Sequence, residues 1–244
     1  TGTWELCAIP SGIVTLDPGS TVELYALGDQ RLTARTDFSN IIFSGSGTKT
    51  ISASFSPQGL VTIKEYAILD AANRQFGDTG TSLTMLDNAY LINRGAGAKP
   101  EMRGTYNLQP TTTIEFSGDA GATIRLAPLY ANIVISGTNI SAGSAAGNGV
   151  TMQSGTTFRV KDGATFNSTN PNGFSGAFNT SVQSLNSPTI ILEDGSTIGY
   201  TFAGDQTITT QSNIGQGANG NYYNLKIGGT SGNKIPNSKT VIVN

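Results

Sequence analysis

The sequence of 244 residues contains no histidine and a single cysteine, Cys7. The absence of histidine removes the side chain that most often serves as a general base or as a transition-metal ligand. A single cysteine excludes an intramolecular disulfide and leaves no basis for a zinc site built from cysteines. We therefore expect no cofactor and no metal centre of these kinds.

Charged side chains are also scarce. They make up 12% of the chain, with a formal net charge of −2, against about 25% in an ordinary domain. The lysines and arginines stand singly, whereas a nucleic-acid surface needs a clustered basic footprint. No apolar run approaches the roughly 20 residues that a membrane-spanning helix needs. We expect neither a nucleic-acid partner nor a membrane span.

Glycine is abundant, with 31 residues in the chain, roughly twice the average usage. No segment combines helical periodicity with helix caps. Short apolar segments that alternate at period two, as in residues 15–24 and 189–200, stand beside Pro-Gly, Ser-Gly and Asp-Gly corners. Such alternation is typical of half-buried strands, and glycine permits the tight corner between them. These features predict an all-β fold.

Three segments of the chain align with one another: residues 19–51, 111–143 and 195–235. The asparagines show the period, since 132 − 40 and 224 − 132 are both 92. Thr113 and Thr197 are only 84 residues apart, and an eight-residue enlargement at 212–219 of the third copy accounts for the difference. We assign structural roles to the matched positions, which are Phe38, Tyr130 and Tyr222; Asn40, Asn132 and Asn224; and Gly45, Gly137 and Gly229.

A long repeat that contains several weaker units predicts a stack of coils, and we favour a parallel β-solenoid over a sandwich or a barrel. At about 22 residues per coil the chain makes about eleven coils of undetermined handedness. We expect one continuous segment over 1–244, with long repeats near 19–110, 111–194 and 195–244. The last repeat looks truncated, because the chain stops inside a strand pattern. The inward column is predicted to hold Val22, Leu24, Ile41, Phe43, Ile114, Phe116, Ile133, Ile135, Ile190 and Leu192.

Four stretches of the first copy resemble the repeats of large extracellular β-solenoid proteins of Bacteroidetes-type bacteria. They are Gly19–Leu24, Phe38–Gly45, Ser46–Thr50 and Gly59–Ile63. Proteins of that family are adhesin-like and are cargo of a secretion system that recognises a C-terminal sorting domain. The second copy departs from the pattern in lacking the GTKT tail, and neither an export signal nor a sorting domain is visible.

The resemblance implies a structural or adhesive stalk segment of a secreted or cell-surface bacterial protein. Its partners would be neighbouring repeats of the same parent chain and, through a lateral face, cell-surface glycans or other surface proteins. We predict no enzymatic activity and no catalytic residue.

A β-helix polysaccharide lyase or hydrolase is the main alternative. Such enzymes need clustered carboxylates with a basic partner, and the candidate pairs are Glu193–Asp194, Glu115–Asp119 and Asp29–Arg31. Asp29 sits in a GDQ turn that recurs at Asp205, and a residue that recurs with the architecture usually serves it. We therefore interpret these acids as structural.

Two further alternatives concern bound ligands of other kinds. Thr48–Thr50, Thr111–Thr113 and Thr207–Thr209 have the spacing of an ice-binding face, but the pattern does not recur at every coil. Calcium would need acidic residues gathered in a loop, and no loop gathers three at alternate positions. Tyr130, Tyr222 and Tyr223 are candidate glycan contacts, although their register with the repeat favours packing.

Overall fold

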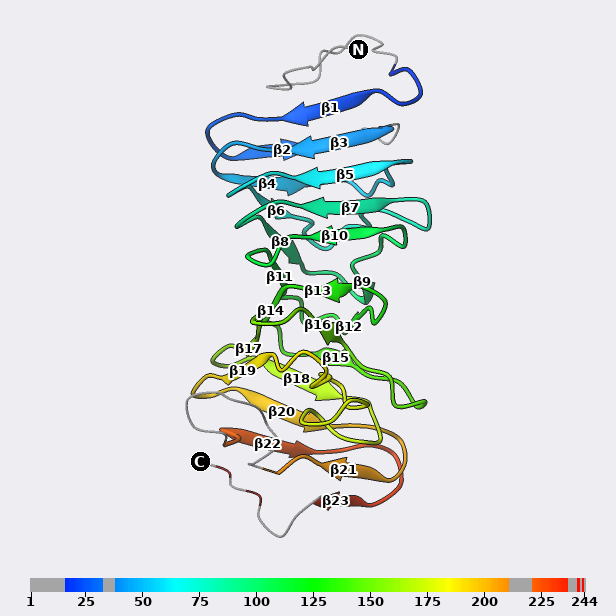
Figure 1. Ribbon diagram of the computed structural model, residues 1–244, viewed down its shortest axis with the longest axis vertical. Coiled ribbons are helices and arrows are strands. Elements are labelled where there is room, and N and C mark those ends of the chain that lie inside the picture. The colour runs from blue at the N-terminus through cyan, green and yellow to red at the C-terminus, as the bar shows by residue number, and fades with distance from the viewer. Residues whose placement is uncertain (1–15, 33–37, 211–220, 237–240, 242, 244) are drawn as a thin grey trace. The chain divides into compact units, whose positions relative to one another are not determined.

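The computed structural model describes residues 16–32, 38–210, 221–236, 241 and 243. This part of the chain is all β and contains no helix, and hence none that could cross a membrane. Figure 1 shows the short strands following one another around successive turns. The predicted parallel β-solenoid is confirmed. Cys7 and the enlargement at 212–219 lie outside the described residues.

The chain divides into two compact units. Unit 1 comprises residues 1–95 and 99–114, and unit 2 comprises residues 96–98 and 115–244. The division falls near residue 111, where the second sequence repeat begins.

Unit 1 is built from parallel strands in which each strand pairs with a strand of the next turn. One sheet has the order β1 (Thr21–Leu24), β3 (Asn40–Phe43), β5 (Leu60–Ile63), β7 (Ser82–Met85) and β10 (Tyr106–Leu108). A second has the order β2 (Gln30–Leu32), β4 (Thr48–Ile51), β6 (Ile68–Asp70) and β8 (Tyr90–Asn93). The parallel bridge between Phe55 and Phe76 adds contacts on a third side.

Unit 2 follows the same plan. Its sheets are β14 (Asn132–Ile135), β17 (Thr157–Val160) and β19 (Thr189–Leu192); β12 (Ala122–Ile124), β15 (Ile140–Ala142), β18 (Thr165–Ser168), β20 (Thr197–Tyr200) and β22 (Asn224–Ile227); β13 (Leu129–Tyr130) and β16 (Thr151–Met152); and β21 (Gln206–Ile208) and β23 (Lys234–Pro236). Strands β9 (Gly97–Lys99) and β11 (Thr113–Phe116) span the division between the units.

Alternation of side chains fixes which residues enter the core. Every second residue along a strand points to the same side of the sheet. Accordingly, half-buried and buried residues alternate along β1, β3, β7 and β14. The predicted inward column is buried at every position except Leu192, which is only partly buried. Burial of the other side chains of this column away from water supplies the main driving force for the fold.

The length of a turn varies, and this corrects the predicted coil count. Thr21 pairs with Asn40, a step of 40 − 21 = 19 residues, whereas Thr157 pairs with Thr189, a step of 189 − 157 = 32. The structure consequently makes about eight turns rather than about eleven. The excess residues are accommodated in loops outside the strands.

The 92-residue repeat does not correspond to a whole number of turns. Asn132 begins β14 and Asn224 begins β22, and these two strands belong to different sheets of unit 2. Matched residues therefore recur on different sides of the stack while keeping the same position within a strand.

The three repeated glycines lie where consecutive turns approach closely. A Cβ at Gly45, Gly137 or Gly229 would stand 2.4, 2.3 or 2.5 Å from a carbonyl oxygen of the preceding turn. Gly45 also has a φ of +72°, in the left-handed region that favours glycine. Close backbone contact thus explains why glycine occupies these positions.

Gly45→Ala should be far more destabilising than Gly19→Ala. Gly19 has a φ of +81° with nothing near its missing Cβ, so its substitution should cost about 1–2 kcal/mol for the left-handed conformation alone. Gly45→Ala should cost about 1–3 kcal/mol more because the methyl group meets the Tyr25 carbonyl. Urea unfolding midpoints compare the two variants, and equal costs would contradict the close approach.

Candidate functional site

The repeated asparagines connect one turn to the next through their side-chain amides. Asn40 Nδ2 donates to the carbonyls of Gly19 and Ser20 at 3.2 and 3.4 Å. Asn224 makes the matching bonds to Gly195 and Ser196 at 3.2 and 3.3 Å. Asn40 and Asn224 therefore make the same contact with the preceding turn.

The amide oxygens of these residues complete the contact on the other side. Asn40 Oδ1 accepts the backbone N–H of Leu60 at 2.9 Å, and Asn132 Oδ1 accepts that of Thr157 at 3.0 Å. An amide carries both donors and an acceptor, so Asn40 can bond to the turn before it and the turn after it.

An aspartate at the first corner of each copy makes a second recurring contact. Oδ1 of Asp29, Asp119 and Asp205 accepts the backbone N–H of Thr48, Thr138 and Asn233, at 2.8, 3.0 and 2.8 Å. The backbone N–H of Thr138, with its hydroxyl, lowers the pKa of the Asp119 carboxyl below its usual value. These acids thus bond to the backbone of the next turn. The recurring GDQ turns had predicted such a structural role for Asp29 and Asp205.

A glutamate, a serine and a lysine from three consecutive turns meet in unit 1. Glu23 Oε1 accepts from Ser44 Oγ at 2.6 Å and from Lys64 Nζ at 2.9 Å. Burial raises the pKa of the Glu23 carboxyl, but these two hydrogen bonds and the lysine charge outweigh it, and the pKa lies below its usual value.

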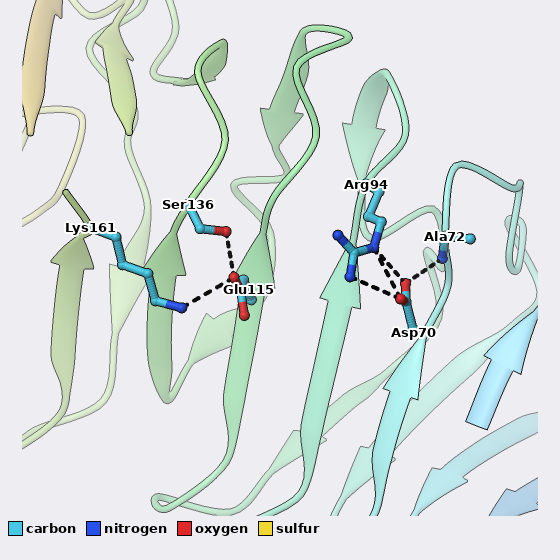
Figure 2. Close-up of polar contacts among 6 residues, drawn as sticks. All are labelled: Asp70, Ala72, Arg94, Glu115, Ser136 and Lys161. Atoms are coloured by element: carbon cyan, nitrogen blue, oxygen red, sulfur yellow. Dashed lines mark hydrogen bonds and ion pairs between the residues drawn. The ribbon is translucent and has the colours of Figure 1, made fainter. Parts of the chain in front are cut away.

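The same three residue types meet again in unit 2, as Figure 2 shows. Ser136 Oγ donates to Glu115 Oε1, and Lys161 Nζ lies 3.4 Å from the same oxygen. Glu23 and Glu115 are 92 residues apart, as are Ser44 and Ser136. The cluster was missed from the sequence although the repeat alignment contained its signal. The third copy has Gly199 and Gly228 at these positions.

Two other ion pairs also join neighbouring turns. Arg94 Nε lies 3.1 and 3.0 Å from the two Asp70 oxygens, and Asp70 Oδ1 accepts the backbone N–H of Ala72 at 2.8 Å (Figure 2). In unit 2, Glu193 accepts from Arg159 at 2.8 Å and from the backbone N–H of Asp162 at 3.1 Å.

The hydrogen bond from the Asp162 backbone is the largest cause that lowers the pKa of the Glu193 carboxyl below its usual value. Asp194 is exposed in the turn that precedes Gly195. Of the predicted pair, Glu193 therefore takes part in an ion pair, whereas Asp194 lies in an exposed turn.

A buried lysine was not foreseen. Lys49 is fully buried, and its ammonium donates to the carbonyls of Ala26, Gly28 and Ser46 at 2.8, 2.8 and 2.6 Å. Burial lowers the pKa of the Lys49 ammonium, and the charge of Asp29 partly opposes this.

Lys234 makes the matching bonds in the third copy, to the carbonyls of Phe202 and Gly204 at 2.7 Å each. Lys49 pairs in register with Gln30 and Lys234 with Gln206, whereas Ala122, which lies 92 residues after Gln30, pairs with Ile140. At this position the second copy thus has an apolar pair where the first and third copies have a polar pair.

The prediction of glycan contacts is wrong for Tyr130 and Tyr222. Both side chains are fully buried, as is Phe38, the matching residue of the first copy. The Tyr130 hydroxyl donates to the Arg125 carbonyl at 2.8 Å and that of Tyr222 to the Thr209 carbonyl at 2.5 Å. Each hydroxyl is satisfied within the fold and each ring is fully buried, so neither ring offers a face to a sugar. Tyr223 is 37% exposed.

The side chains of the other predicted ligand sites also do not come together in one place. Thr209, proposed for an ice-binding face, is buried and its hydroxyl accepts from the backbone N–H of Phe174. Asp29, Glu115 and Asp119 each take part in a separate contact between turns. The described residues contain no group of three or more Asp, Glu, His or Cys side chains that could hold a metal ion.

Comparisons with known proteins add no identification. A scan against protein-family models, a search of curated proteins and a search of solved structures each found no match to this chain.

Substitution of Glu23 should alter the response of unit 1 to acid. A carboxyl whose folded pKa is lowered stabilises the fold above its unfolded pKa, and this contribution disappears as the pH falls through the folded value. The usual pKa of the glutamate is 4.5. The stability difference between wild type and Glu23→Gln should therefore be present at neutral pH and vanish in acid below that value.

Thermal unfolding midpoints between neutral pH and strong acid measure this difference. Glu65→Gln, at an exposed glutamate of the same unit, is the control and should follow the wild type throughout. A difference for Glu23→Gln that stayed constant with pH would contradict the assigned ionised state.

Proposed function

We propose that this chain is a structural and adhesive stalk segment of a secreted or cell-surface bacterial repeat protein. Its task would be to maintain a hydrogen-bonded stack of turns whose sides present polar surface for weak, multivalent contacts. Cell-surface glycans and other surface proteins are the partners that this role requires.

The observation that carries the proposal is the use made of the repeated polar residues. The asparagines, the corner aspartates and the Glu23 and Glu115 clusters bond to the neighbouring turn within each unit. A catalytic carboxylate must instead face a substrate with a second group beside it. Engagement with the next turn favours an architectural role for these side chains.

A β-helix carbohydrate-active enzyme is the competing function, and Glu115 with Lys161 is the acid–base combination that favours it most. The recurrence of this cluster at Glu23 and Lys64 argues against it. An active site is needed once, whereas a contact that supports the stack is useful wherever the same strands meet.

Beads coated with the chain test the adhesive role. They should adhere to surfaces coated with bacterial or host-cell glycans, while the soluble chain binds weakly, because many linked contacts raise apparent affinity by about 10²–10⁴-fold. Equal and negligible retention of coated and bare beads would contradict adhesion.

A parallel assay addresses the enzyme. The wild type is incubated with acidic and neutral polysaccharides, and new reducing ends or unsaturated products are measured. We expect none. Product formation that disappears in Glu115→Gln but persists in the matched variant Glu23→Gln would overturn the proposed function and assign catalysis to unit 2.

A further inference from the structure

One segment of unit 2 departs from the repeated architecture. Residues 169–188 join β18 to β19 without a strand of their own, and the turn that contains them is the 32-residue one. Long loops on a regular scaffold are the usual places for binding residues. The segment therefore differs in kind from the short corners.

Internal bonds and a buried aromatic group hold this segment in place. Phe174 packs against Phe158 and Phe166, with ring centroids 6.1 and 5.5 Å apart. The backbone N–H of Val182 donates to the Phe174 carbonyl at 2.7 Å, and Asn186 Nδ2 donates to the Met152 carbonyl at 2.6 Å. A loop tied down in this way offers a preformed surface.

A pocket of about 220 Å³ opens at this segment. Its polar lining comes from Gln183, Ser184, Ser187 and Thr189, and Pro188 and Ile190 contribute apolar surface. Among the described residues that line it, none is ionisable. A pocket of mixed polar and apolar character, smaller than the roughly 300 Å³ at which drug-sized sites begin, fits a small neutral ligand.

Several polar groups of the lining are available to such a ligand. The hydroxyls of Ser184, Ser187 and Thr189 make no hydrogen bond to any residue that the structure describes. Gln183 is fixed, because Oε1 accepts from Thr151 Oγ1 at 3.2 Å. Ser187 has a φ of +47°, a conformation that is uncommon outside glycine and that clusters at functional sites.

Two large apolar side chains of the same segment are exposed. Phe178 is 63% exposed and Leu185 is 56% exposed. The backbone N–H of Ser184 donates to the Ala177 carbonyl at 3.1 Å, and Phe178 and Leu185 directly follow these two bonded residues. An exposed aromatic ring and unpaired hydroxyl groups on one short segment suit a sugar ring, which has apolar C–H faces and a rim of hydroxyls.

We propose that residues 176–190 form a binding site for a neutral saccharide, with one sugar ring in the pocket and Phe178 stacked on its apolar face. This inference rests on the proposed adhesive function and gives it a ligand class and a place. It replaces the buried Tyr130 and Tyr222 as the aromatic contact.

Nuclear magnetic resonance titration of the isotope-labelled chain tests the site. The probes are the methyl glycosides of glucose, galactose, mannose and N-acetylglucosamine. At least one should shift the backbone amides of residues 176–190. Phe178→Ala should weaken its binding at least about tenfold, equivalent to 1.4 kcal/mol, without unfolding the chain because the ring is mostly exposed. Tyr66→Ala removes a 73% exposed aromatic side chain of unit 1 and should change nothing.

Ser187→Gly separates a binding role from a structural one. Glycine accepts the positive φ, so the thermal midpoint should not fall, while loss of the hydroxyl should weaken glycoside binding several-fold. Unchanged binding in this variant and in Phe178→Ala would overturn the site, as would a failure of all four glycosides to shift these amides.

Other results distinguish this inference from the proposed function. If Phe178→Ala beads adhere to glycans as well as wild-type beads, the stalk function stands and the pocket is not its site. A concentration-dependent dimer that Phe178→Ala abolishes would make this surface an interface between copies and overturn the saccharide. Polysaccharide cleavage would overturn the stalk function, whichever result the titration gives.

Discussion

Hydrogen bonds from side chains to the backbone of the adjacent turn are the constraint on which the rest of this structure depends. Parallel strands pair through their own backbone groups, but N–H groups at the starts of strands, such as those of Thr48, Leu60 and Thr157, bond to side chains instead. Asn40, Asn132 and the corner aspartates supply the missing partners. Regular strands and irregular corners can therefore stack at one spacing.

This constraint explains the composition. A corner that bonds to the turn above must approach it closely, which requires glycine at Gly45 and its counterparts. The polar groups used there are asparagine amides and the carboxylates of aspartates that accept backbone N–H groups. Where a charge enters the interior, as at Lys49, three carbonyl oxygens surround it. An unpaired charge in that position would be very costly.

The strand pattern made the fold class predictable, because alternation at period two identifies inward residues such as Ile41 and Phe43 directly. The number of turns was not predictable, because loops such as residues 169–188 add length without changing the strands. Repeat register favoured packing of Tyr130, which the structure buries, but nothing in the sequence indicated that the Arg125 carbonyl would accept from its hydroxyl. Lys49, by contrast, shares the inward side of β4 with Ile51, a signal that the sequence contained. The pocket at residues 176–190 had no such signal, because it lies outside the three segments that align with one another.

Amide hydrogen exchange at Leu60 tests the central claim most directly. Its backbone N–H donates to Asn40 Oδ1, as that of Thr157 donates to Asn132 Oδ1, and both should be protected in the wild-type chain. In Asn40→Ala the Leu60 amide should exchange much faster while the Thr157 amide keeps its protection. Unchanged exchange at Leu60 in that variant would show that asparagine side chains do not join the turns, and would contradict the account.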